Sequence, residues 1–227
     1  MGIYLLYFVI IMIIPLWAQA KVKGTYSRFA QVANQTGYTG AQAARVILDQ
    51  HGLYHVGIEE IGGRLTDHYD PRDKVLRLSS ENYHGRSIAG IAVAAHEVGH
   101  AIQDKENYAP LRFRHALVPV ANLGSNLSYF FIIIGILLHF TQLAVLGIIF
   151  FAAAVLFQLV TLPVEFNASS RAMAQLADLG LITSEERSPA RKVLSAAALT
   201  YVAAALVAVL ELLRFVFMFL GTNNNEE

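Results

Sequence analysis

Four long apolar segments constrain this chain more than any other feature of its sequence. Each is long enough to cross a bilayer, which takes about 20 consecutive apolar residues in a helix. The segments run from Ile3 to Ala20, from about Leu117 to Phe140, from Leu143 to Val164 and from Leu194 to Leu220. Of the 227 residues, 55% are hydrophobic and 15% are charged, whereas a soluble domain usually has about 25% charged residues. We therefore predict a multi-pass membrane protein.

The apolar segments leave one large polar region and one smaller one. We predict a first transmembrane helix over 1–20, a polar lobe over 21–116, a transmembrane helical hairpin over 117–164, a polar segment over 165–193, a fourth transmembrane helix over 194–220 and a tail over 221–227. The hairpin is expected because only Thr141 and Gln142 separate the second and third apolar segments.

The first apolar segment has two interpretations. Ala18-Gln19-Ala20 resembles a signal-peptidase site, which would make the segment a cleaved leader. However, no Lys or Arg precedes the apolar run, whereas Lys21 and Lys23 follow it. This charge order is the opposite of that in a signal peptide, so we favour an uncleaved membrane anchor.

Positive charge predicts how the chain is oriented in the membrane. Twelve of the 17 Lys and Arg residues lie between Lys21 and Arg114, four lie within 165–193, and only Arg214 lies elsewhere. Cytoplasmic loops carry the excess of positive residues in membrane proteins. We therefore expect a protein of the cell membrane (plasma or inner membrane) with both polar regions in the cytoplasm and both termini outside.

The polar lobe contains both helix and strand patterns. Residues 39–42 (Thr-Gly-Ala-Gln) form a capping box before a helix expected over about 40–50. Two strands, 64–70 and 74–80, are joined by a turn-like Asp-Pro-Arg-Asp sequence. A longer helix rich in Ala and Ile is expected over about 87–105. The predicted fold is a mainly α membrane protein with four transmembrane helices and a lobe that contains a small β element.

The chemistry of the chain is indicated by an H-E-x-x-H motif in the 87–105 helix. His96 and His100 are four residues apart, so both imidazoles lie on one helical face and can bind one Zn²⁺. Glu97 could take the proton from a zinc-activated water as it attacks a peptide carbonyl. An exposed helix with two unrelated histidines is the alternative. The apolar run 88–95 before the motif favours a packed site, where unpaired histidines would be costly.

A catalytic zinc needs a third protein ligand, and the composition limits the choice. The chain has no cysteine, so the ligand is His, Asp or Glu. Glu165, at the end of the third apolar segment, is on the same side of the membrane as the motif. Asp178, Glu185 and Glu186 share that side, in a segment expected to be solvated. Alternatively, Glu165 is an ordinary interfacial carboxylate. A net charge of zero without a basic block argues against nucleic acid as a partner.

Stretches along the whole chain resemble a known family. They are Trp17-Ala-Gln-Ala-Lys-Val-Lys23, His68-Tyr-Asp-Pro-Arg-Asp-Lys-Val-Leu-Arg-Leu-Ser79, Ala94-Ala-His-Glu-Val-Gly-His-Ala-Ile-Gln103 and Leu162-Pro-Val-Glu-Phe-Asn-Ala-Ser169. They resemble the neutral zinc metallopeptidase family of bacterial membrane proteins (YugP-like), which is similar to the HtpX-type membrane gluzincins. The resemblance implies a zincin-like metallopeptidase lobe over 21–116. It also implies one zinc per chain, with His96, His100 and Glu165 as metal ligands and Glu97 as the catalytic residue.

One position departs from the wider gluzincin pattern. Where that group has an Asp four residues after the ligand Glu, this chain has Ser169. The support that the Asp would give to the metal ligands is therefore unassigned, and Asn167 or Ser169 itself could replace it.

Three further residues could contact the substrate or stabilise the oxyanion. His68 and Tyr69 could do so as His and Tyr do in soluble gluzincins, although a solvent-facing strand end is an equally good interpretation. Arg171 could serve the same purpose or pair with a lipid phosphate. The 74–80 strand could present an edge to an extended peptide, or it could be an ordinary core strand.

Together these patterns predict a membrane-bound zinc metalloendopeptidase at the cytoplasmic membrane face. Its partners would be the lipid bilayer and protein or peptide substrates that are membrane-associated, as the resemblance suggests. The alternative is an inactive membrane adaptor or a metal-handling membrane protein. A transporter binds its cargo mid-membrane, whereas these ligands fall at or outside the ends of the apolar segments. We also expect Glu165 in the first turn of a new helix, where the helix dipole favours a carboxylate.

Overall fold

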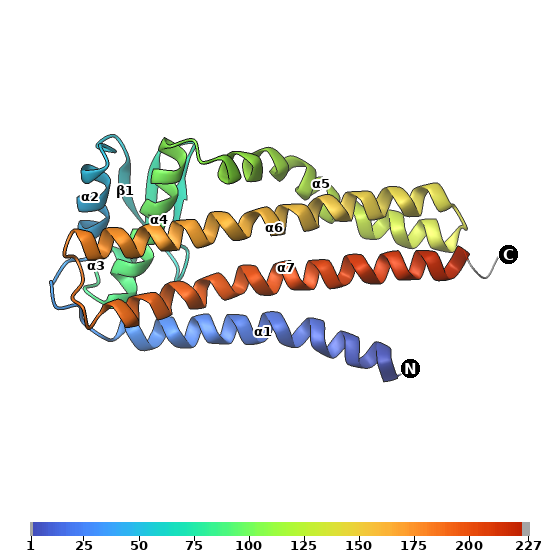
Figure 1. Ribbon diagram of the computed structural model, residues 1–227, viewed down its shortest axis with the longest axis horizontal. Coiled ribbons are helices and arrows are strands. Elements are labelled where there is room, and N and C mark those ends of the chain that lie inside the picture. The colour runs from blue at the N-terminus through green and yellow to red at the C-terminus, as the bar shows by residue number, and fades with distance from the viewer. Residues whose placement is uncertain (1, 224–227) are drawn as a thin grey trace. The chain divides into compact units, whose positions relative to one another are not determined.

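The computed structural model describes residues 2–223 and consists mainly of helices (Figure 1). In chain order the elements are α1 (Gly2–Ala30), α2 (Gly40–Gln50), β1 (Gly57–Ile61), β2 (His68–Asp70), β3 (Val75–Ser79), α3 (Ser80–His84), α4 (Ile88–Lys105), α5 (Ala109–Leu137), α6 (Thr141–Asp178) and α7 (Arg187–Asn223). They form two units. We call residues 1–17, 109–163 and 201–227 the apolar unit, and residues 18–108 and 164–200 the polar unit. Residues 224–227 of the predicted tail lie outside the described residues.

Four of these helices, α1, α5, α6 and α7, are long and apolar enough to cross a membrane. The prediction of a mainly helical membrane protein with four apolar helices and a small β element is therefore confirmed. Each helix also extends beyond the apolar segment that predicted it at one end or both, although α5 ends at Leu137, before Phe140. Helix α1 runs on to Ala30 and α6 to Asp178, because polar residues such as Lys21 and Gln175 end a hydropathy signal but are good helix formers and need not end a helix.

The expected position of Glu165 in the first turn of a new helix is wrong. Helix α6 starts at Thr141 and passes through Pro163 without ending, so Glu165 lies deep in its interior. Proline removes one backbone hydrogen bond, but long apolar helices tolerate that loss when neighbouring groups compensate. The helix dipole therefore gives Glu165 no N-terminal stabilisation.

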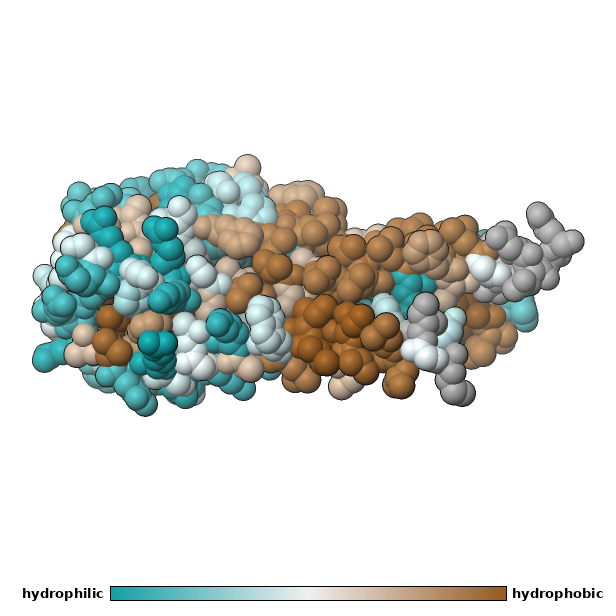
Figure 2. Space-filling model, turned by 60° about the horizontal axis from the view of Figure 1, so that its bottom comes forward, coloured by the Kyte–Doolittle hydropathy of each residue, from teal (hydrophilic) through white to brown (hydrophobic). Residues whose placement is uncertain are grey.

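Within the apolar unit, α5 and α6 lie side by side (Figure 1), and the turn that joins them is at 138–140 rather than at Thr141 and Gln142, which begin α6. Glycine allows their backbones to approach closely: a Cβ at Gly135 would lie 2.4 Å from the backbone nitrogen of Ala144. Phe151 and Phe215 are buried in this unit and meet edge to face, with ring centroids 5.2 Å apart. Figure 2 shows a broad continuous apolar surface. Exposed large hydrophobic side chains of this unit include Phe130. Such a surface fits contact with lipid.

The polar unit has its own hydrophobic core, built around α2 and α4. The predicted capping box is present, since the Thr39 hydroxyl accepts from the Gln42 backbone N–H and the Gln42 side chain accepts from the Thr39 N–H. Helix α4 begins after Ser87, whose hydroxyl accepts from the Gly90 N–H. Leu48 and Ile91 are fully buried in the shared core. Both helices occupy the ranges that the sequence predicts.

The sheet differs from the predicted pair of strands. It has three strands in the order β1-β3-β2, with β1 parallel and β2 antiparallel to β3. The expected strand over 64–70 is reduced to β2, because Leu65 has a left-handed φ of 58° that interrupts extended backbone. Strand β3 is paired on both sides, so the idea that it offers an edge to a peptide is wrong. Strand β2 is an edge strand.

Candidate metal centre

His96, His100 and Glu165 come together in the polar unit. The two histidines lie on one face of α4, and their ring centroids are 4.8 Å apart. Their Nε2 atoms lie 3.2 Å (His96) and 3.5 Å (His100) from Oε2 of Glu165. The side chains are 12%, 13% and 4% exposed, respectively. Three ligand atoms from α4 and α6 thus converge on one small volume.

These distances fit a tetrahedral zinc ion. Two ligand atoms at about 2.0–2.2 Å from a tetrahedral zinc lie about 3.3–3.6 Å apart. The observed separations between Glu165 Oε2 and the imidazole nitrogens are 3.2 and 3.5 Å. All three ligand atoms lie within 4.8 Å of one another. Two imidazoles and one carboxylate are also a ligand set that catalytic zinc uses, with one position left for water or substrate.

The charges around the histidines favour a cation at this place. Burial alone would lower the pKa of His100, but hydrogen bonding to Glu165 and the negative charges of Glu97 and Glu165 raise the pKa above its ordinary value. The carboxylates that raise this pKa would also attract a metal ion, which competes with the proton for the same lone pair.

Close packing of α4 against α6 brings the third ligand within reach. Gly99 lies between the two histidines, and a Cβ there would lie 2.7 Å from the carbonyl oxygen of Ala168 and 3.1 Å from its Cα. Real side chains do not approach backbone this closely, so only glycine fits. The second variable position of the H-E-x-x-H motif therefore determines how near the helix that carries Glu165 can come.

The other ring nitrogen of each histidine also has a partner. The Nδ1 of His96 lies 3.1 Å from the Ser169 hydroxyl. The Nδ1 of His100 lies 3.0 Å from Oε1 of Gln103. Partners of this kind hold an imidazole in position and select which nitrogen faces the metal. Ser169 stands where the gluzincin pattern has Asp, and it makes its contact with the first histidine of the motif.

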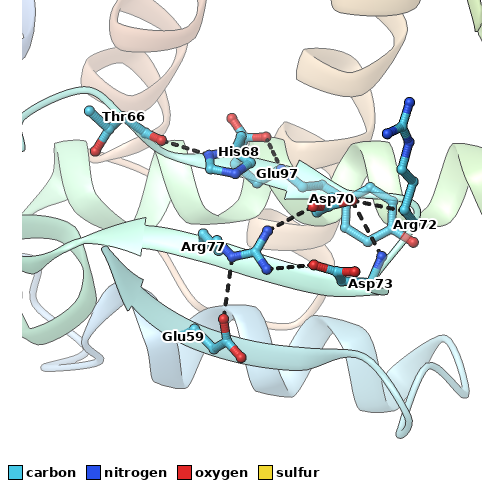
Figure 3. A network of polar contacts seen from close by, with 9 residues as sticks. Glu59, Thr66, His68, Asp70, Arg72, Asp73, Arg77 and Glu97 are labelled. Atoms are coloured by element: carbon cyan, nitrogen blue, oxygen red, sulfur yellow. Dashed lines mark hydrogen bonds and ion pairs between the residues drawn. The ribbon is translucent and has the colours of Figure 1, made fainter. Parts of the chain in front are cut away.

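Glu97 lies beside the three candidate ligands, and the sheet holds its side chain. Its Oε2 accepts a hydrogen bond of 3.1 Å from the backbone N–H of Tyr69 in β2 (Figure 3). Burial raises the pKa of the Glu97 carboxyl, while positive charge on His96 and His100 acts in the opposite direction. Among residues 2–223, the hydrogen bond of the Glu97 carboxylate is made by Oε2.

Strand β2 is fastened to β3 by a network of charges (Figure 3). Arg77 donates from Nη1 to Asp70 at 2.7 Å, from Nη2 to Asp73 at 2.8 Å and from Nε to Glu59 at 3.3 Å. Hydrogen bonds from the Arg72 backbone N–H and from Arg77 lower the pKa of Asp70 to about 2. The network therefore stays charged at neutral pH. It keeps β2 in register with β3 and so fixes the position of the Tyr69 N–H that contacts Glu97.

The three candidate substrate contacts are engaged with other groups. The hydroxyl of Tyr69 donates to Asp104 at 2.9 Å, and the Nδ1 of His68 lies 2.8 Å from the Thr66 carbonyl oxygen. Arg171 donates to Asn167 at 2.7 Å and pairs with Glu106 at 2.7 Å. The backbone N–H of Tyr69 therefore contacts Glu97 beside the candidate ligands, whereas the Tyr69 hydroxyl contacts Asp104.

Gln103 and Asp104, both buried on α4, also have partners near this centre and were not predicted from the sequence. Asp104 accepts from the Tyr69 hydroxyl and pairs with Lys74. Gln103 contacts His100 three residues before it. Gln103 follows His100 by three residues, and this i, i+3 spacing, which places both side chains on one helix face, could have predicted the contact. A buried glutamine inside an otherwise apolar run is the second signal, because such a group needs hydrogen-bond partners.

Comparison with known proteins decides the family. Residues 4–220 match the sequence profile described as "Putative neutral zinc metallopeptidase". This chain belongs to that family. The match covers all elements that supply the candidate ligands, so the family is a property of the chain as a whole rather than of the H-E-x-x-H motif alone.

A curated relative supports this assignment. The chain is 54% identical over 205 residues to the protein named "Putative membrane protease YugP" of Bacillus subtilis (strain 168), which covers 90% of this chain and 91% of the relative. No solved structure matches the chain. The family and relative support a membrane-bound zinc protease, in agreement with the His96, His100 and Glu165 cluster that could hold the metal.

Proposed function

We propose that this protein is a membrane-bound zinc metalloendopeptidase that hydrolyses peptide bonds at the centre formed by α4 and α6. The observation that carries the proposal is the convergence of His96, His100 and Glu165 at zinc-like spacing, with Glu97 beside them and outside the ligand set. A structural zinc site uses four protein ligands, whereas three ligands and an adjacent carboxylate are the arrangement of a catalytic one.

Different residues of the chain would carry out the separate tasks of hydrolysis. When bound, zinc would act as a Lewis acid that polarises the scissile carbonyl and activates water. Glu97 is placed to accept the proton of the attacking water and to pass it to the leaving amine. The N–H of Tyr69 holds one carboxylate oxygen of Glu97, so that the other can face the reacting atoms. This division assigns proton transfer to Glu97 and metal binding to its neighbours.

The partners of the imidazole Nδ1 atoms would support the ligands. Ser169, bonded to His96, occupies the place of the usual gluzincin Asp, and we assign it that supporting role. Asn167 would support the centre indirectly, because it contacts Gln103 rather than a metal ligand. We keep His68, Tyr69 and Arg171 as candidate substrate or oxyanion contacts, which requires that Tyr69 and Arg171 exchange their present partners on substrate binding.

The substrates we propose are proteins or peptides associated with the membrane. Glu165 lies two residues after Pro163, the last residue of the apolar unit in α6. A ligand on a helix that continues from an apolar, membrane-compatible segment supports cleavage close to the bilayer. For an active site that acts far from lipid, we would not expect a candidate ligand on the same helix as an apolar, membrane-compatible segment.

The proposal is tested by metal analysis and hydrolysis with the full chain in detergent or lipid. We expect about one zinc per chain, and cleavage of a membrane-tethered peptide that stops with chelator and returns when zinc is restored. Zinc binding without cleavage of any peptide in a broad library would contradict the peptidase and favour the adaptor or metal-handling alternative. Cleavage that persists after complete zinc removal would contradict the metal mechanism.

We further propose that the polar unit lies on the cytoplasmic side of the cell membrane. The 16 Lys and Arg residues of 21–114 and 165–193 support this orientation. The chain has no cysteine, so single cysteines introduced at the exposed positions Ser80 and Gln142 can be labelled separately. We expect an impermeant thiol reagent outside intact cells to label Gln142→Cys but not Ser80→Cys. The reverse pattern would contradict the orientation.

A further inference from the structure

Gln103 makes three polar contacts although it is completely buried. Its exposed fraction is 0%. Its Oε1 lies 3.0 Å from Nδ1 of His100, and its Nε2 donates to the Val164 carbonyl oxygen at 2.8 Å and to Oδ1 of Asn167 at 3.0 Å. A buried amide with all three neighbours in place is held in one orientation. Neither the hydrolysis derived above nor the family resemblance assigns a role to this side chain.

The contacts on α6 determine which end of the Gln103 amide faces His100. Arg171 can only donate, so the Asn167 atom that it contacts at 2.7 Å is the amide oxygen. That oxygen accepts from the nitrogen of Gln103, as does the Val164 carbonyl, which can only accept. Two independent acceptors thus orient the Gln103 nitrogen toward α6 and leave its oxygen for His100.

The orientation of Gln103 in turn determines the tautomer of His100. An amide oxygen only accepts, so Nδ1 of a neutral His100 must carry the hydrogen. The second ring nitrogen, Nε2, then has a free lone pair, and this is the atom that lies 3.5 Å from Glu165 Oε2. A neutral imidazole with its lone pair at Nε2 is the form that binds a metal there.

The Gln103 side chain also connects α4 and α6, the two helices that carry the candidate ligands. Gln103 belongs to α4, three residues after His100, and Val164 immediately precedes Glu165 in α6. The Arg171–Glu106 pair at 2.7 Å provides a second tie farther along both helices. A loss of the Gln103 contacts would therefore disturb His100 and Glu165 at once.

We infer that Gln103 is a positioning residue that presets His100 as the Nδ1–H tautomer and holds the Glu165 segment of α6 at metal-binding distance, with Arg171 and Asn167 setting the direction of the hydrogen bonds. This inference rests on the proposed metal centre for its purpose. The preset tautomer is, however, a property of the metal-free protein and can be measured without zinc.

The first measurement is the tautomer of His100 in metal-free full-length protein above the pKa of the imidazole, by ¹⁵N NMR of labelled histidine, assigned with His100→Gln. We expect the Nδ1–H form in the wild type. In Gln103→Met, which has similar length but no amide, we expect a mixture dominated by the Nε2–H form of free imidazole. A wild-type His100 in the Nε2–H form, or a tautomer that Gln103→Met leaves unchanged, would overturn the inference.

The second measurement is zinc affinity by chelator competition. Loss of a group that orients a metal ligand typically lowers affinity about 10- to 100-fold, and we expect this for Gln103→Met. Gln103→Glu keeps an acceptor for His100 Nδ1 but loses the donor to Val164 and Asn167, so it should keep the Nδ1–H tautomer while its zinc affinity stays below that of the wild type. Ile102→Val, an adjacent buried change without polar contacts, should lower only the melting temperature.

The two proposals fail differently. Equal zinc affinity in the wild type and Gln103→Met would leave the metal centre intact and reduce Gln103 to a packing residue. An absence of stoichiometric zinc in the wild type, together with the Nδ1–H tautomer, would contradict the proposed function and still support the role of Gln103 in orienting His100.

Discussion

Glu165 in the polar unit and Glu211 in the apolar unit are both buried carboxylates on long apolar helices, but their partners differ. Glu211 on α7 accepts from the Tyr7 hydroxyl at 2.5 Å and from Nη2 of Arg214 at 2.6 Å. Glu165 on α6 instead has the Nε2 atoms of two histidines as neighbours. The exposed fractions of the two glutamates are similar, at 3% and 6%.

The difference lies in the charge that each partner can supply. Arginine is always charged, so Arg214 balances Glu211 without any further ion. Histidine near neutral pH is charged only when protonated, so the two imidazoles beside Glu165 can bind either a proton or a metal cation. A buried carboxylate is therefore not by itself a sign of function. What distinguishes the proposed site is the pair of histidines beside the carboxylate, because a neutral imidazole can bind a metal ion and a guanidinium cannot.

Replacement of Glu165 should have the largest effect and separates the two glutamates most clearly. Glu165→Ala removes one of three ligands, so we expect zinc affinity to fall by more than about 100-fold and hydrolysis to be lost. Equilibrium dialysis against a zinc buffer and a peptidase assay measure the two effects. Normal zinc affinity in this variant would mean that another acid, such as Asp178 or Glu186, supplies the third ligand.

Glu97→Gln tests the division between metal binding and proton transfer. The amide keeps the shape of the side chain but cannot take a proton, so hydrolysis should fall about 10²- to 10⁴-fold. Zinc content should remain near one per chain because Glu97 is outside the ligand set. Metal analysis and turnover are measured on the same preparation. Near-normal turnover would exclude Glu97 as the base and revive the adaptor alternative.

Glu211→Gln tests the balanced pair of the apolar unit. The change leaves Arg214 without its counter-charge, which typically costs about 1–3 kcal/mol when the group is buried. We expect a lower melting temperature with zinc stoichiometry unchanged. A loss of bound zinc comparable to that of Glu165→Ala would show that the two carboxylates serve one site and would remove the contrast drawn here.

Gly99→Ala tests the close approach of α4 and α6. Its Cβ would lie 2.7 Å from the Ala168 carbonyl oxygen, and overpacking of this kind costs about 1–3 kcal/mol. We expect a lower melting temperature together with weaker zinc binding, because α6 carries Glu165. Gly24→Ala is the matched control. Its Cβ would have no heavy atom within 4 Å apart from the nearby backbone of α1 itself, so it should slightly stabilise α1.

Local patterns in the sequence were sufficient to predict the long helices and two of the three candidate metal ligands, His96 and His100. Hydropathy identified the four long apolar helices, and the capping box placed α2 at Gly40–Gln50. The i, i+4 spacing put His96 and His100 on one face because a helix repeats every 3.6 residues. Each of these inferences depends on residues within a few turns of one another, where backbone geometry alone determines which side chains are neighbours.

Contacts between distant segments could not be derived in the same way. The sequence resemblance implied Glu165 as a ligand, but only the packing of α6 on Gly99 shows how it comes within 3.2 Å of His96, 69 residues away in sequence. Likewise, the central position of β3 depends on the parallel pairing with β1, which no local pattern predicts.

The residues of the chain were therefore enough to predict a membrane protein with four long apolar helices and with His96 and His100 on one helix face. The packing of distant segments was needed to see that α6 continues through Pro163, that β2 rather than β3 is an edge strand, and that Gln103 joins His100 to the Glu165 segment. The physical reason is that helix periodicity and hydropathy act over a few residues, whereas tautomers and ligand distances depend on how helices far apart in the chain pack together.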